Sequence, residues 1–97
     1  MQRAILIPYD DLAAFCRRHH IRKLALFGSV LREDFGPDSD VDVLVEFEPG
    51  HTPGWEIVAL EDELSLLLGR AVDLRTPEEL SRHWRQQVVD SAYVIHE

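Results

Sequence analysis

Two apolar runs joined by a polar connection constrain this sequence more than any other feature. The first run, 24–27, reads Leu-Ala-Leu-Phe and closes at Gly28-Ser29; ten residues later Asp40 precedes the second run, 41–45. A nearly continuous apolar run is typical of a strand covered on both faces. We therefore expect two strands of one sheet, with a Gly-Ser turn ending the first and carboxylates opening the second.

Hydrophobic periodicity along the rest of the chain predicts alternating helices and strands. In chain order, the expected elements are an edge strand or loose segment over 1–8, a helix N-capped by Asp10, strand 21–27, a helical turn over 30–34, strand 41–47, helix 55–68, strand 71–75, a helix after the capping box at 76–79 and strand 92–95. This order indicates an α/β layered structure.

Residue chemistry also predicts how the later helices begin and end. Thr52 followed by Pro53 resembles an N-cap with proline in the first turn, and Gly69 is expected to end that helix. Trp55 and Trp84 are expected in or beside the core rather than in contact with a nucleotide base.

Size, charge and cysteine content limit the classes of function. The 97 residues suit a single domain spanning 1–97, and the net charge of −8 argues against binding long nucleic acid, whose affinity depends on neutralised phosphates. Cys16 is the single cysteine, so no internal disulfide forms and a reducing, cytoplasmic setting is expected. No apolar segment approaches the length of a membrane span, so no membrane partner is expected.

Asp40 and Asp42 are the strongest candidates for metal ligands. Residues two apart on a strand project to one side, with Cα atoms roughly 6.5–7 Å apart. Asp73 lies opposite the apolar face of its own strand, and it converges with the other two if strand 71–75 lies beside 41–47. Carboxylates about 4 Å apart repel by about 4 kcal/mol at an effective dielectric of 20, so such a trio calls for a cation, with magnesium favoured. The alternative is a solvated face of a half-covered strand.

The Gly28-Ser29 turn is a candidate phosphate site. Glycine at a strand end lets backbone N–H groups approach a phosphate, and the serine hydroxyl donates another bond. Arg32 has donors suited to a triphosphate. Taken singly, these residues equally suit an ordinary turn and a surface arginine.

The histidines show no ligand spacing that indicates a zinc site. They are His19, His20, His51, His83 and His96.

Taken together, these motifs resemble the signature of the polymerase-β-like nucleotidyltransferases. The resemblance lies in Gly28-Ser29, ten intervening residues, and Asp40-x-Asp42 leading into Val-Leu-Val. Arg32, and the Pro-Asp-Ser that precedes Asp40, are similar to the small prokaryotic branch, the minimal nucleotidyltransferase (MNT) domains. The resemblance implies a polymerase-β-like fold with a small mixed sheet packed with helices.

The same resemblance implies a site that binds ATP and two Mg²⁺ ions. It assigns nucleotide binding to Gly28, Ser29, Arg32 and Ser39, and metal binding and catalysis to Asp40, Asp42 and Asp73. Asp73 is expected to help deprotonate the attacking hydroxyl.

Many proteins of this branch are antitoxins that transfer AMP from ATP to a tyrosine of a cognate HEPN ribonuclease toxin. The resemblance therefore implies a protein adenylyltransferase with a HEPN-domain toxin as its partner. Two alternatives stay open. A non-catalytic antitoxin would neutralise its partner by covering it, with its acidic charge imitating RNA. An enzyme of the same chemistry would instead transfer the nucleotide to a small molecule.

Overall fold

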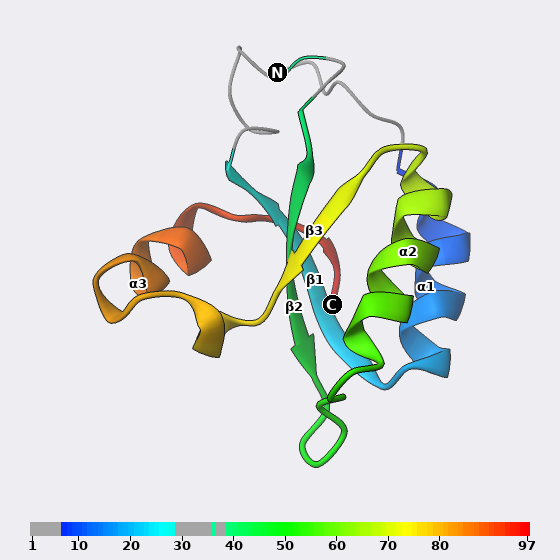
Figure 1. Cartoon of the computed structure of the whole chain (residues 1–97), viewed down its shortest axis with the longest axis horizontal. Coiled ribbons are helices and arrows are strands. Elements are labelled where there is room, and N and C mark those ends of the chain that lie inside the picture. Colours follow the sequence, from blue (N-terminus) through cyan, green and yellow to red (C-terminus); the bar gives the residue numbers. More distant parts are fainter. Residues whose placement is uncertain (1–6, 29–35, 37–38) are drawn as a thin grey trace.

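The computed structural model describes residues 7–28, 36 and 39–97, which form a sheet of four strands with helices on both sides (Figure 1). The elements are α1 (Tyr9–Arg18), β1 (Ile21–Phe27), β2 (Val41–Phe47), α2 (Ile57–Leu68), β3 (Val72–Arg75), a short 3₁₀ helix (Pro77–Glu79), α3 (Arg82–Ser91) and β4 (Tyr93–His96). The expected alternation of helices and strands is confirmed.

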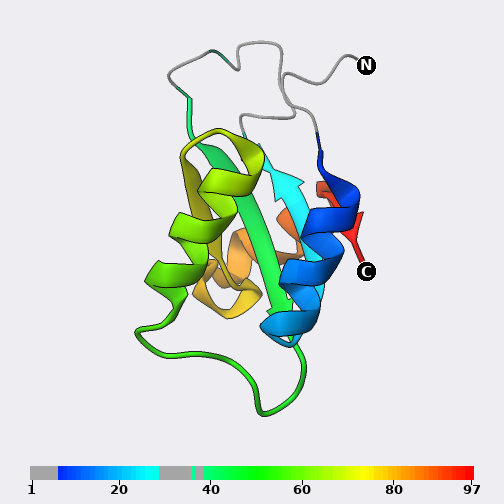
Figure 2. The ribbon, with the colours of Figure 1, turned by 90° about the vertical axis from the view of Figure 1, so that its right-hand side faces the viewer.

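The sheet is mixed, with the strand order β3-β2-β1-β4. β1 pairs antiparallel with both β2 and β4, whereas β2 pairs in parallel with β3. A parallel pair needs a crossover, which α2 supplies between β2 and β3. Figure 2 shows α1 and α2 side by side over one face of the sheet, and Figure 1 shows α3 on the other side.

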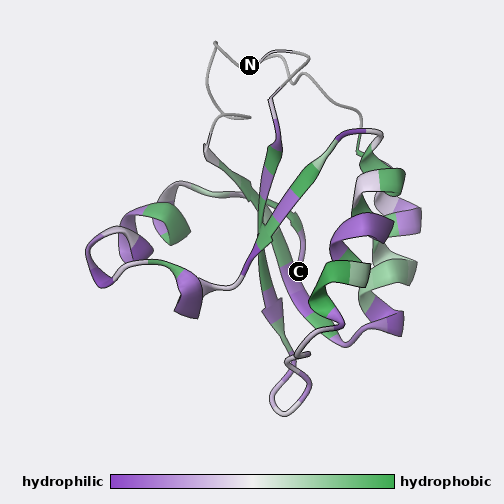
Figure 3. Ribbon diagram, viewed as in Figure 1, coloured by the Kyte–Doolittle hydropathy of each residue, from purple (hydrophilic) through white to green (hydrophobic). Residues whose placement is uncertain are grey.

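The main core lies between the sheet and the two helices α1 and α2. Its fully buried side chains include Leu12, Phe15, Leu24, Leu26, Val41, Val43, Val45 and Leu64. Hydrophobic and hydrophilic residues alternate along β2 (Figure 3), as expected for a strand with two different faces. On the opposite face, Ala25 and Leu44 pair in register and are also buried.

Cys16 belongs to this core. Burial raises the pKa of its thiol to about 12, so the thiol stays protonated and unreactive near neutral pH.

Truncating Leu64 tests the packing of α2 on the sheet. Leu64 is 0% exposed, so we expect Leu64→Ala to lower the free energy of unfolding by about 2–5 kcal/mol through lost burial and a residual cavity. Urea unfolding followed by circular dichroism measures this. Leu66→Ala is the matched control, because Leu66 is 84% exposed on the same helix and its loss should change stability by at most about 0.5 kcal/mol. Equal losses in the two variants would contradict this packing.

Three predicted helix starts are wrong in detail. α1 begins at Tyr9 with Pro8 as N-cap, because the Leu12 N–H already bonds the Pro8 carbonyl at 2.9 Å; Asp10 lies in the first turn, where its charge suits the helix dipole. α2 begins at Ile57, and its N-cap, Glu56, makes no side-chain capping bond. The Thr52-Pro53 pair therefore lies in the preceding loop, where turns at 54–56 delay the helix.

The capping box at 76–79 exists, but it caps the 3₁₀ helix rather than α3. α3 starts later, at Arg82, with Ser81 accepting a hydrogen bond from the His83 N–H. Gly69 ends α2 in the left-handed conformation, with φ of 69°, as predicted.

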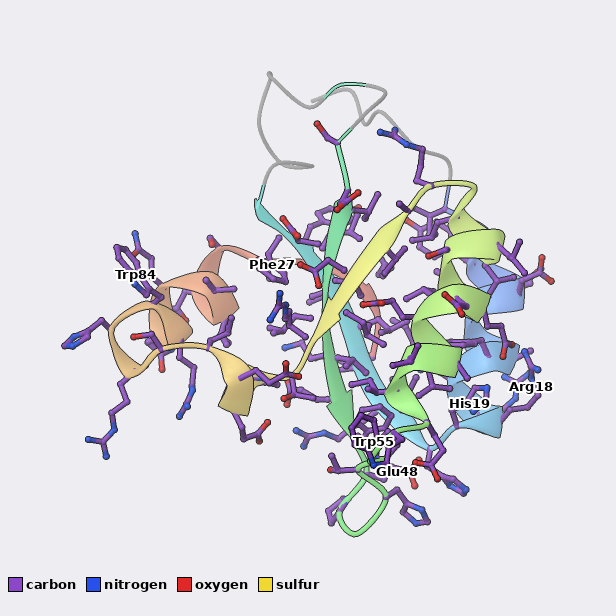
Figure 4. All side chains as sticks on the ribbon, in the orientation of Figure 1. Arg18, His19, Phe27, Glu48, Trp55 and Trp84 are labelled. Carbon is purple, nitrogen blue, oxygen red and sulfur yellow. The ribbon has the colours of Figure 1, made fainter. Side chains whose placement is uncertain are left out.

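The two tryptophans are not core residues. Trp55 is 93% exposed and Trp84 61% exposed, so the expectation of burial is wrong for both. Trp55 precedes α2 in a turn, and Trp84 lies on the part of α3 that faces away from the sheet (Figure 4). Residues 1–6 and the helical turn expected over 30–34 lie outside the described residues.

The helices that the structure describes are all too short, or too polar, to cross a lipid bilayer.

Candidate active site

The candidate site lies at the end of the sheet where β1 ends and β2 and β3 begin. Asp42 pairs in register with Phe27 of β1 on one side and with Asp73 of β3 on the other. Neighbouring strands lie about 4.8 Å apart, so residues in register share a face at close range. Val41 and Val43 face the core, which places Asp42 and Asp73 together on the opposite face.

Gly28 ends β1 directly against the Asp42 carboxylate. Its φ is +72°, a left-handed conformation that side chains with a β-carbon adopt only with strain. A β-carbon built on Gly28 would lie 2.3 Å from Asp42 Oδ2, closer than real contacts allow. Position 28 therefore requires glycine for two reasons. The turn needs a left-handed backbone, and the Asp42 carboxylate occupies the space that a β-carbon would fill.

Asp40 lies immediately before β2, is exposed, and is two residues from Asp42. The Val41 N–H donates to the Ala71 carbonyl at 2.8 Å, which ties the start of β2 to the start of β3. This bond holds the part of β2 that carries Asp40 beside the strand that carries Asp73.

Arg70 organises the chain that leads into Asp40, and the sequence did not indicate this role. Its Nη2 donates to the carbonyl oxygens of Gly36 at 2.5 Å and Ser39 at 3.0 Å. The Gly36 N–H donates in turn to Ser39 Oγ at 3.1 Å. An arginine after the helix-ending Gly69 looks like any solvated arginine in the sequence, so no pattern could have singled it out.

Asp73 is paired with Arg75, a second residue that sequence reasoning missed. Arg75 Nε lies 3.1 Å from Asp73 Oδ1 and Nη2 lies 3.3 Å from Oδ2. The hydrogen bond and charge of Asp73 raise the pKa of Arg75, and the charges of Glu79 and Asp42 add to the effect. Arg75 therefore supplies positive charge on the face that carries the aspartates.

The structure thus brings some of the predicted site residues close together and leaves others apart. Gly28, Asp42 and Asp73 share one end of the sheet with Asp40 beside them, while the Ser39 hydroxyl bonds Gly36 in the approaching loop. Within the described part of the chain, the three aspartates do not form a group whose carboxylate oxygens all lie within 4.8 Å of one another. Ser29 and Arg32 lie outside the described residues.

The donor set suits magnesium. Mg²⁺ prefers carboxylate oxygens and completes its shell with waters and phosphate oxygens. Asp40, Asp42 and Asp73 supply such oxygens, and the Asp42 carboxylate occupies a space that only glycine at position 28 leaves open. These residues fit a site for divalent cations. Arg75 competes with such a cation for the Asp73 carboxylate.

Removing Arg75 tests that competition. We expect Arg75→Ala to tighten Mg²⁺ binding by about two- to fivefold, because the ion no longer competes with a guanidinium worth up to about 1 kcal/mol at a half-exposed position. Calorimetric titration with MgCl₂ measures the affinity, and Arg82→Ala, on exposed α3, is the control. Weaker Mg²⁺ binding by Arg75→Ala would mean that Arg75 positions Asp73 for the ion instead.

The sheet order, the glycine turn and the carboxylates on adjacent strands define the class of a small nucleotidyl-transferring domain. The family model described as "Nucleotidyltransferase domain" matches residues 11–95, and the chain belongs to this family.

Two of the curated relatives carry the name protein adenylyltransferase. The chain is 30% identical over 74 residues to the provisionally named protein adenylyltransferase MJ1379 of Methanocaldococcus jannaschii, covering 75% of this chain and 74% of that protein. It is 43% identical over 58 residues to protein adenylyltransferase MntA of Thermococcus cleftensis, covering 59% of this chain and 57% of the relative.

Solved structures share the fold. A structure provisionally described as a minimal nucleotidyltransferase superposes with a TM-score of 0.71 at 36% identity, covering 87% of this chain and 85% of the other. The polymerase-β-like fold predicted for a minimal nucleotidyltransferase is confirmed.

Two toxin–antitoxin complexes are less similar in sequence. A toxin–antitoxin complex with AMP-PNP matches with a TM-score of 0.72 and covers 92% of this chain and 73% of that one. An MNT antitoxin bound to a tri-AMPylated HEPN toxin of Shewanella oneidensis matches with a TM-score of 0.63 and covers 90% and 67%. Both are 22% identical to this chain and establish likeness of fold alone.

Proposed function

We propose that this chain transfers AMP from ATP to a tyrosine hydroxyl of a HEPN ribonuclease toxin and so acts as its antitoxin. The observation that carries the proposal is the Asp42–Asp73 pair, in register on adjacent strands, with Gly28 against Asp42. The names of the relatives support AMP transfer to a protein, and the tri-AMPylated complex supports a toxin as acceptor.

In this proposal, the end of the sheet binds the triphosphate. The N–H groups of the turn at Gly28 approach the phosphates, and Ser29, Arg32 and Ser39 complete the nucleotide contacts. Asp40, Asp42 and Asp73 hold two Mg²⁺ ions. When bound, these ions neutralise the phosphates and stabilise the attacking and leaving oxygens.

The reaction is an in-line displacement at the α-phosphorus. The tyrosine oxygen forms a bond to the α-phosphorus, and the bond from that phosphorus to the bridging oxygen breaks, so pyrophosphate leaves with the electron pair. The hydroxyl proton passes to the Asp73 carboxylate. Arg75, paired with Asp73 at 3.1 and 3.3 Å, orients the carboxylate that accepts this proton.

Mass spectrometry of the partner tests the proposal. The protein encoded beside this chain is co-expressed with and without it, and the intact mass and fragment spectra are compared. We expect one or more AMP increments on a tyrosine, found only when this chain is present. Neutralisation of an unmodified toxin would favour masking, and label from α-labelled ATP on a small amine would favour a small-molecule acceptor.

A further inference from the structure

We propose that His20, Glu48 and His51 form a second metal site, for a zinc-type transition-metal ion, at the end of the sheet opposite the aspartates. Among the described residues, these three are the group whose candidate ligand atoms all lie within 4.8 Å of one another. No spacing in the sequence indicated the site, because its ligands come from two separate loops. The proposal is independent of AMP transfer.

The site is remote from the aspartates because β1 and β2 separate the two. His20 precedes β1 and Glu48 follows β2, whereas Gly28 and Asp40 lie at the other ends of the same strands. Figure 4 places the Glu48 label at the lower end of β2, away from Phe27, the last residue of β1. A strand of seven residues spans about 23 Å, so an ion at one end does not reach the ligands at the other.

Two backbone hydrogen bonds hold the three residues together. The Glu48 N–H donates to the His20 carbonyl at 2.8 Å, and the His51 N–H donates to the Glu48 carbonyl at 3.0 Å. The second bond closes a turn in which Gly50 has φ of 82°. These backbone hydrogen bonds therefore fix the positions of the three residues relative to one another.

The three side chains lie close enough together to reach one ion. The imidazole rings of His20 and His51 stack with centroids 3.9 Å apart and planes inclined by 17°, and His20 Nδ1 lies 4.0 Å from Glu48 Oε1. Ligand atoms on one zinc ion, bound at 2.0–2.2 Å, lie roughly 3.4 Å apart in a tetrahedral site. Because the lone pair of an imidazole nitrogen lies in the ring plane, the stacked rings must turn out of their stacking before both face one ion. All three side chains are exposed, which leaves room for that rotation.

The backbone at His20 adds an independent observation. His20 follows the C-cap of α1 and has φ of 56°, the one non-glycine residue with positive φ among those described. Glycine suits this position after a helix better, because it has no β-carbon. A histidine held there at a conformational cost points to a use for its imidazole.

The chemistry of the donors selects the ion. Two imidazoles and one carboxylate suit zinc, nickel or copper, whereas Mg²⁺ prefers oxygen ligands alone. Three protein ligands leave a position for water, and the side chains are exposed enough for an ion to enter from solvent. A bound Zn²⁺ would link the turn after α1 to the loop after β2.

Zinc titration tests the site. Untagged full-length protein carrying Asp40→Asn and Asp42→Asn, to weaken the acidic centre, is titrated with ZnCl₂ by calorimetry and with Co²⁺ by visible absorption. We expect one Zn²⁺ per chain and a rise in Tm on zinc addition. Adding His51→Ala, Glu48→Gln or His20→Gly should weaken Zn²⁺ binding by roughly tenfold or more, since even partners of metal ligands contribute that much.

The choice of variants separates binding from folding. His20→Gly suits the left-handed backbone, so it removes the imidazole without straining the turn. His83→Ala is the control, because His83 is exposed on α3 outside the cluster; it should bind Zn²⁺ as its parent does and keep the rise in Tm. The proposal is overturned if the parent binds no stoichiometric zinc, or if the three cluster variants bind zinc as tightly as the His83 variant.

Discussion

If the proposed function is correct, replacing Asp40 and Asp42 together with asparagine is expected to reduce AMP transfer by at least about 10³-fold while leaving the fold and the proposed toxin complex intact. Asparagine keeps the shape of each side chain but removes the charge that holds divalent ions, and loss of a single electrostatic contact to a reacting group already costs 10²–10³-fold in rate. The loss of repulsion between carboxylates offsets the lost attraction of Asp42 to Arg75, so we expect stability to change by no more than about 1 kcal/mol. Transfer of α-labelled ATP onto the purified toxin measures the rate, and thermal unfolding checks the fold.

Glu46→Gln is the matched control for the double variant. Glu46 lies on the same strand and the same face as Asp42, but its partner is Arg22, at 2.5 Å. We expect it to transfer AMP at the parent rate. If the double variant still neutralises the toxin fully, neutralisation comes from covering the toxin, and the catalytic proposal is wrong.

Gly28→Ala is expected to lower both stability and activity. The left-handed backbone, with φ of 72°, costs about 1–2 kcal/mol for alanine. The added methyl group also meets Asp42 Oδ2 at 2.3 Å and must displace that carboxylate. We expect stability to fall by about 2–3 kcal/mol, which combines the backbone cost with overpacking, and AMP transfer to fall by about 10²-fold, since misplacing a reacting group by an ångström costs that much.

Gly69→Ala is the control that separates the backbone strain from the clash with Asp42. Gly69 has φ of 69°, and a β-carbon there would meet nothing within 4 Å, so this variant carries the backbone strain alone. Denaturant unfolding and label transfer are measured on both variants. Equal losses of stability, together with full activity in Gly28→Ala, would show that the close approach to Asp42 has no role in the site.

The sequence predicted most of the elements because hydrophobic period and helix-ending glycine are local signals. The alternation predicts a strand over 41–47, where the structure has β2, and Gly69 ends α2 as expected. The errors lie where several local signals compete. Thr52 has the chemistry of an N-cap, but turns between it and Ile57 delay the helix. Trp55 is apolar yet exposed, since its place before the first turn of α2 keeps it off the sheet.

The sequence alone determined which side chains of β2 share a face, because alternation along a strand depends only on position. Tertiary structure decided what lies opposite them. The parallel register sets Asp73 beside Asp42, and the placement of Arg75 gives Asp73 a cationic partner.

The same physical reason explains the cluster of His20, Glu48 and His51. These residues are 28 and 3 positions apart in the chain and meet because antiparallel pairing brings the start of β1 to the end of β2. Strand pairing depends on contacts between distant residues, so the local pattern that places a side chain on a strand or in a turn does not say which side chain it will meet.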